Sequence, residues 1–164
     1  MARLVLTDAS PLIGLARLDG LQWLGALFGQ ADVPQEVRDE VLSGRGFPDE
    51  KRIVSAEQAG WLRVRCSSPT SPPLPDLDAG ESACIRIALA HPEPSLLLMD
   101  DRIGRAVARE HGLFVAGTAA VIGMAKTRGL IPSARDAFAR LHASDFRISR
   151  DVIEAILRRV GEAG

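Results

Sequence analysis

The chain has 164 residues, 46% of them hydrophobic, and a formal net charge of −1 at pH 7. This length suits one well-buried core and is short for two, so we expect a single domain over residues 1–164. No apolar run approaches the roughly 20 residues of a membrane span, and the N-terminus lacks the apolar stretch of a secretory signal, which predicts a soluble, cytoplasmic protein. The near-neutral charge argues against binding nucleic acid by bulk electrostatics and leaves a local basic patch open.

The first half of the chain alternates short apolar strands with helices. A strand from Arg3 to Thr7 ends in Asp8, and Ser10 is the expected N-cap of the next helix, with Pro11 at its first position. The following elements are expected to be a helix at 21–28, a strand at 31–33, a helix from Pro34 to about Leu42, a helix at 49–58 and an edge strand at 61–65. Residues 67–75 contain four prolines, which predicts an exposed loop.

The second half repeats this alternation. The expected elements are a helix at 79–91, a strand at 95–99, a helix at 102–111, a strand at 113–116 and helices at 119–127, 134–142 and 149–161. The apolar run at 96–99 leads directly into Asp100 and Asp101 and is expected to be a buried central strand. Helices alternating with apolar strands predict an α/β protein with a parallel sheet, and ligands of such sheets bind outside the carboxyl ends of the strands.

Three aspartates follow these predicted strands. Asp8 ends the first strand, where it can also satisfy backbone donors of the turn into the first helix. Either Asp100 or Asp101 can cap the helix that begins at Arg102, but only one can be its N-cap. The other aspartate is then left for solvent or for a ligand.

Two glutamates lie beside apolar helical stripes. Glu81 follows Asp78 at the spacing of a capping box, and it also shares a helix face with buried positions. Glu40 lies on its helix near Val37 and Val41. If these acids converge with the strand-end aspartates, their repulsion requires neutralisation by cations, and ligands without His or Cys favour Mg²⁺ or Mn²⁺. Two such ions at about 3.5–4 Å can promote hydrolysis of a phosphodiester.

Several segments then carry a resemblance to a known family. Residues 4–13, 33–41, 77–83 and 96–102, with Gly117-Thr118 after the next strand, resemble the PIN domain. More narrowly, the Asp-Ala-Ser-Pro-Leu and Leu-Asp-x-Gly-Glu signatures resemble an uncharacterised PIN-like branch related to VapC-type toxin ribonucleases. The resemblance covers roughly residues 3–130, and the helices at 134–161 also look like that branch.

The resemblance implies a three-layer α/β/α sandwich with a mainly parallel central sheet, and a metal-dependent ribonuclease that uses Mg²⁺ or Mn²⁺. Its metal ligands or water activators would be Asp8, Glu40, Glu81 and one of Asp100 and Asp101. Asp101 is favoured because the family often has a polar residue directly before this acid. Glu81 departs from the aspartate usual in the wider family. The resemblance also implies an RNA substrate, an antitoxin that covers the acidic pocket, and a homodimer.

Other polar residues near the acids have more than one interpretation. Ser10 resembles the hydroxyl of the family's first motif, and Thr118 either orients a water near the metal or caps its own helix, with capping favoured. Arg102, Arg105 and Arg109 share one helix face that begins beside the acid pair. They can hold RNA phosphates, or they can form a solvated face that pairs with acids such as Glu110.

Rival classes fit these residues less well. A receiver domain has its acid pair after the first strand rather than after a late one, and a haloacid-dehalogenase-like phosphatase needs an acid where Ser10 stands. The alternative that stays open is a PIN-like module with weak catalysis that binds an antitoxin or another protein. The acids are compatible with both an active nuclease and such a binding module.

Overall fold

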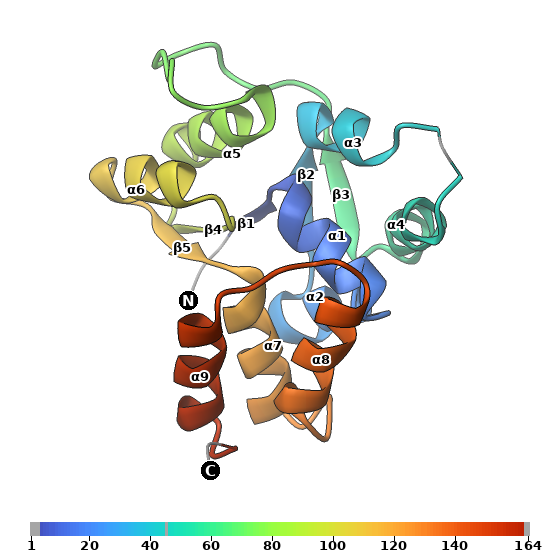
Figure 1. Cartoon of the computed structure of the whole chain (residues 1–164). Helices are drawn as coiled ribbons and strands as arrows, with labels where there is room; N and C mark the ends of the chain where they lie inside the picture. The colour runs from blue at the N-terminus through green and yellow to red at the C-terminus, as the bar shows by residue number, and fades with distance from the viewer. Residues whose placement is uncertain (1–3, 45, 163–164) are drawn as a thin grey trace.

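A computed structural model of the chain describes residues 4–44 and 46–162. In this part of the chain, five strands form one parallel sheet in the order β3-β2-β1-β4-β5 (Figure 1). The strands are β1 (Leu4–Thr7), β2 (Ala31–Pro34), β3 (Leu62–Arg65), β4 (Ser95–Leu98) and β5 (Phe114–Ala116). The expected α/β class and parallel sheet are therefore confirmed, with β3 at an edge as predicted. Arg3, the predicted first strand residue, lies outside the described residues.

The strand order places the predicted buried strand inside the sheet. β4, the strand after Pro94, pairs with β1 on one side and β5 on the other, and β1 occupies the middle position of the five strands. Leu6 and Leu97 are paired across β1 and β4, and both are fully buried. The long apolar run of β4 reflects burial on both faces, which a strand next to the central one shares with it. Hydrophobicity alone therefore did not distinguish these two positions.

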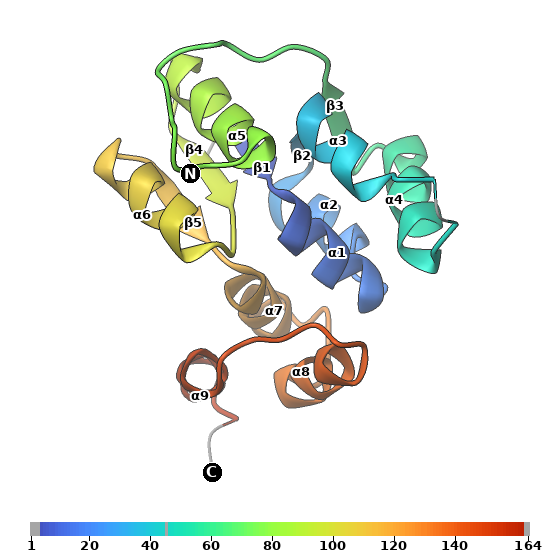
Figure 2. The ribbon, with the colours of Figure 1, turned by 45° about the horizontal axis from the view of Figure 1, so that its top comes forward.

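Nine helices connect and cover the strands of the described segments. They are α1 (Ala9–Arg17), α2 (Gln22–Phe28), α3 (Gln35–Val41), α4 (Pro48–Ala59), α5 (Ala79–Ala90), α6 (Arg102–Glu110), α7 (Thr118–Thr127), α8 (Ala134–Ala143) and α9 (Arg150–Arg159). α5 and α6 lie on one face of the sheet, and α1, α2, α4 and α7 lie on the other (Figures 1 and 2). This arrangement is the expected three-layer α/β/α sandwich.

The C-terminal helices extend the second helical layer. α8 and α9 pack against α7 and against each other, below the sheet in the view of Figure 1. Ser133 and Ser149 cap them by accepting hydrogen bonds from the backbone N–H groups of Asp136 and Val152. In the described part of the chain, no helix combines the length and apolar character needed to span a membrane.

The start of α1 differs from the prediction. The helix begins at Ala9, and Asp8, with an extended backbone at φ −81° and ψ 176°, occupies the N-cap position. Ser10 therefore lies inside the helix, and its hydroxyl donates a hydrogen bond to Asp100 rather than capping α1. Pro11 is the third helical residue, where its missing N–H group costs no intrahelical hydrogen bond.

Candidate functional site

The register of the sheet brings acidic residues to one edge. Thr7 pairs with Leu98, and Leu98 pairs with Ala116, so the three chain segments leave the sheet side by side. The backbone N–H of Asp8 continues this pattern and donates to the carbonyl of Leu98 at 2.9 Å. Asp8, Asp100 and Asp101 consequently emerge at the carboxyl edge, where ligands of parallel α/β sheets bind.

Asp8 is a buried acid with an unsatisfied oxygen. Its relative exposure is 6%, and its Oδ1 atom has no hydrogen-bond partner among the described residues. Burial, together with repulsion from Asp78, Glu40 and Asp100, raises the pKa of Asp8 to about 7. α5 approaches this oxygen closely, because a Cβ atom at Gly80 would lie only 3.1 Å from it. The close approach confines Asp8 beside the first turn of α5.

Glu81 is the second buried acid, and it interacts with Asp78. The backbone N–H of Glu81 donates to Asp78 Oδ1 at 2.8 Å, as the capping-box spacing predicts. Burial, the nearby charge of Asp78 and a side-chain hydrogen bond with Asp78 raise the pKa of Glu81 to about 8. Asp78 thus belongs to the acidic cluster, although its sequence context suggested only a cap. Its position in the same helical turn as Glu81 was the signal available.

Glu40 completes the cluster from α3. Its neighbours Val37 and Val41 are buried, as expected for the apolar stripe, whereas Glu40 itself is exposed at the border. Partial desolvation and the charge of Asp78 raise the pKa of Glu40. The structure therefore places Glu40 at the rim of the cluster, while Asp8 and Glu81 lie deeper.

The two neighbouring aspartates have different surroundings. Asp101 Oδ2 accepts a hydrogen bond from the backbone N–H of Gly104 at 2.8 Å and caps α6. Asp100 Oδ2 accepts hydrogen bonds from the hydroxyl groups of Ser10 at 2.6 Å and Thr118 at 2.7 Å. Its Oδ1 atom accepts a hydrogen bond from the backbone N–H of Thr118 at 2.7 Å. Asp100 is therefore held by protein groups. We expected the aspartate that does not cap α6 to face solvent or a ligand, and this prediction is wrong.

Thr118 corrects a related prediction. It is the first residue of α7 and follows Gly117 at the N-cap position, so it does not cap its own helix. The Asp100 carboxylate instead accepts the N–H group at this helix end. A carboxylate at a helix N-terminus is also favoured by the helix dipole. Asp100 consequently ties together the ends of β4, α1 and α7.

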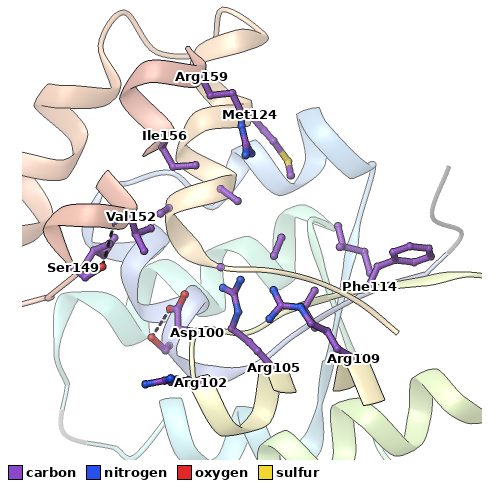
Figure 3. A pocket seen from close by; sticks show the side chains of 18 of the residues that line it. Asp100, Arg102, Arg105, Arg109, Phe114, Met124, Ser149, Val152, Ile156 and Arg159 are labelled. Carbon is purple, nitrogen blue, oxygen red and sulfur yellow. Dashed lines mark hydrogen bonds between the residues drawn. The ribbon is translucent and has the colours of Figure 1, made fainter. Parts of the chain in front are cut away.

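The arginines of α6 face a groove rather than acids. Arg102, Arg105 and Arg109 line one side of a groove of about 1350 Å³ that also includes Asp100, as Figure 3 shows. None of them forms an ion pair with another described residue, so the expected alternative of pairing with Glu110 is not seen. The Arg105 guanidinium approaches the acidic edge, because a Cβ atom at Gly117 would lie 2.7 Å from its Nη1.

The acidic cluster has the chemistry of a site for a hard divalent cation, although its carboxylates would have to move closer together to share one ion. No three His, Cys, Asp or Glu side chains within residues 4–44 and 46–162 are arranged to hold a metal ion as they lie. The unpartnered Asp8 Oδ1 and the raised pKa values of Asp8 and Glu81 nevertheless show that ionisation of these buried carboxyls is unfavourable unless a cation lies beside them. An all-oxygen donor set of this kind suits Mg²⁺ or Mn²⁺.

Comparison with known proteins identifies a family for the chain. The family model DUF3368, described as a PIN domain, matches residues 4–162. Searches of curated proteins and of solved structures found no match. The matched segment includes all five strands and every acid of the cluster. The chain therefore belongs to the PIN-domain family DUF3368.

Proposed function

We propose that the acidic edge is the active site of a metal-dependent endoribonuclease, and that this enzyme is the toxin of a toxin–antitoxin pair. PIN domains are nuclease-type folds, which is the level at which the family supports the proposal. The observation that carries it further is Asp8, a buried carboxylate with an unpartnered oxygen among other acids. Leaving a charge buried without a partner is costly, so such a cluster has a reason to exist where a cation binds.

We assign roles to the acids from how deeply each side chain is buried. Asp8 and Glu81 would hold Mg²⁺ or Mn²⁺ from below, and Glu40 and Asp101 would approach it from the rim. When bound, the ion supplies Lewis-acid stabilisation of charge on the phosphodiester. Asp78 shares a hydrogen bond with Glu81 and can fix the orientation of that carboxylate. Asp101 fits a ligand role better than Asp100, because Asp100 already accepts three hydrogen bonds.

Asp100, Ser10 and Thr118 have a positioning role in this proposal. Their hydrogen bonds hold the turn after β1 against the turn after β4, and these turns carry Asp8 and Asp101. A displacement of about 1 Å at such a site is sufficient to lower catalysis by about a hundredfold. The three side chains would therefore affect catalysis through the position of the acids rather than through contact with the ion.

The biological setting rests on the resemblance to VapC-type toxins. It includes an RNA substrate, an antitoxin that covers the acidic pocket, a homodimer and a cytoplasmic location. The second candidate function is a PIN-like binding module with weak catalysis. The observation that favours it is the spacing of the carboxylates, which would have to move closer together to hold an ion.

A paired binding and cleavage experiment separates the two functions. Calorimetry with Mg²⁺ and Mn²⁺ should detect binding to the wild-type protein and not to Asp8→Asn. A panel of structured RNAs should be cleaved by the wild type, with no cleavage in EDTA or by Asp8→Asn. Asp76→Asn, in the exposed loop before α5, is the matched control and should behave as the wild type. Absence of both metal binding and cleavage would instead support the binding module.

A further inference from the structure

The groove beside the acidic edge is strongly basic on both sides. Arg102, Arg105 and Arg109 of α6 line one wall, and Arg147 and Arg159 line the opposite wall near and on α9. Among the described residues that line it, Asp100 is the only acid, and its oxygens already accept three hydrogen bonds. The chain as a whole has a net charge of −1, yet five arginines lie on the facing walls of this groove. Positive charge is therefore concentrated in the groove.

The floor of the groove is apolar and includes an exposed aromatic ring. Phe114, on the edge strand β5, is 66% exposed, and Val152 of α9 is 45% exposed. Figure 3 shows Val152, Ile156 and Met124 across the groove from the α6 arginines, with Phe114 at its end beside Arg109. A row of arginines beside an exposed aromatic ring is typical of surfaces that bind single-stranded nucleic acid.

The groove is continuous with the candidate active site. Ser10 and Asp100 belong to its lining, and Arg102 directly follows Asp101. From Arg102 to Arg109 the arginine row extends about 10 Å along the helix axis. The volume of about 1350 Å³ exceeds the roughly 300–1000 Å³ typical of sites for small ligands, which suits a chain of several units.

We propose that this groove binds a single-stranded segment of the RNA whose neighbouring phosphodiester lies at the acidic edge. The arginines would contact phosphates, and Phe114 would stack on a base. This inference rests on the proposed ribonuclease function. A duplex fits less well, because its bases are paired and stacked and leave the apolar floor without a partner. An acidic peptide added to β5 also fits less well, because the arginines lie on two facing walls rather than along this three-residue strand.

Equilibrium binding without cleavage tests the proposal. Fluorescence anisotropy in EDTA would use a labelled single-stranded RNA of about 12 nucleotides, its duplex, and polyglutamate. We expect Phe114→Ala to weaken binding of the single strand by about 5- to 100-fold, as for loss of one stacked base. Arg109→Gln and Arg159→Gln should each reduce the slope of log affinity against log salt by about 0.7. The duplex should bind more weakly than the single strand.

A matched arginine on the same helix is the control. Arg158 is the exposed neighbour of Arg159 and does not line the groove, so Arg158→Gln changes the net charge equally and should leave binding unchanged. Wild-type affinity in the Phe114 and Arg159 variants, or equal losses with Arg158→Gln, would overturn the proposal. Tighter binding of polyglutamate with the same arginine dependence would also overturn it, in favour of a protein partner.

The proposed RNA-binding groove and the proposed nuclease activity can be refuted separately. Binding is measured in EDTA and again with Asp8→Asn, so it does not depend on cleavage. Groove-dependent binding of single-stranded RNA supports the inference even if the wild type cleaves no RNA in Mg²⁺. If cleavage depends on metal but the groove variants bind RNA as the wild type does, the proposed nuclease function is supported. The proposal that the groove binds RNA is then refuted.

Discussion

Replacing Asp8 by asparagine should stabilise the protein at alkaline pH when no divalent ion is present. The substitution keeps the shape of the side chain and removes a charge from a site that is 6% exposed. Burial and neighbouring acids raise the pKa of Asp8 from 3.8 to about 7, so ionisation of this carboxyl opposes folding. A neutral amide avoids that cost.

The size of the effect follows from the pKa shift of Asp8. A shift from 3.8 to about 7 corresponds to about 4 kcal/mol between the protonated and ionised forms. Since the native carboxyl binds its proton more tightly than the unfolded one, its contribution to stability is full below pH 3.8 and is lost as the pH rises to about 7. Relaxation around the site reduces the effect, so we expect Asp8→Asn to gain about 2–3 kcal/mol at about pH 8 and almost nothing at about pH 3.5.

Urea denaturation in EDTA, followed by tryptophan fluorescence, measures this gain. Trp23 is buried and reports on the core. At a metal concentration about 100 times its Kd, the wild type should recover about 2.7 kcal/mol through binding, and Asp8→Asn should recover almost none. Asp76→Asn, at an exposed loop position, controls for loss of one negative charge.

Two results would refute this reasoning. One is a loss of stability in Asp8→Asn at about pH 8 in EDTA, which would mean that the carboxylate already has a stabilising partner. The other is an equal gain at about pH 8 and about pH 3.5, which would place the effect in packing rather than in charge.

Four further substitutions probe the supports of the site in urea or thermal unfolding. Asp100→Ala should lower the free energy of unfolding by about 2–4 kcal/mol, because it leaves the donors of Ser10 and Thr118 without an acceptor. Asp101→Ala removes one hydrogen bond at the start of α6 and should lower it by about 1 kcal/mol. Equal losses in the two variants would contradict the distinction between the two aspartates. Gly104→Ala places a Cβ atom 2.8 Å from the Sδ of Met99 and should cost about 1 kcal/mol despite better helix propensity, so a raised Tm would be contrary evidence. Glu162→Gln weakens the carboxylate that accepts N–H groups at the start of α8 and should cost about 1 kcal/mol, and an unchanged midpoint would show that this cap is dispensable.

The pattern of apolar residues was sufficient to predict the sheet and its helices. Alternation of short apolar runs with helical stripes placed each strand within about one residue, since burial on both faces of a parallel strand leaves a direct signature. Strand order has no such signature, and β1 and β4 carry similar apolar runs. The central position of β1 therefore required the structure.

Local sequence rules misassigned residues whose partners are distant. Ser10 and Thr118 lie in the first turns of α1 and α7 and were interpreted as caps, but Asp100 accepts hydrogen bonds from both hydroxyls. The cap of Asp78 was predicted correctly, and this sufficient explanation concealed its side-chain contact with Glu81. The wall that Arg159 adds to the groove depends on the packing of α9 against α7, which no local pattern indicates.

The acidic edge and the basic groove meet at Asp100 and Asp101, which follow Met99 after β4, and their opposite charges are consistent with a single use. A polyanion held in the groove would bring phosphate charge towards carboxylates whose pKa values are already raised by burial and by repulsion from neighbouring acids, as for Asp8 and Glu81. The arginine row begins beside this edge, where Arg105 approaches Asp100, and continues away from it along α6. None of these arginines forms an ion pair with a described acid of the cluster. A cation at the acidic edge would relieve both repulsions together. RNA and metal binding should therefore each strengthen the other, through a coupling free energy that is equal in both directions.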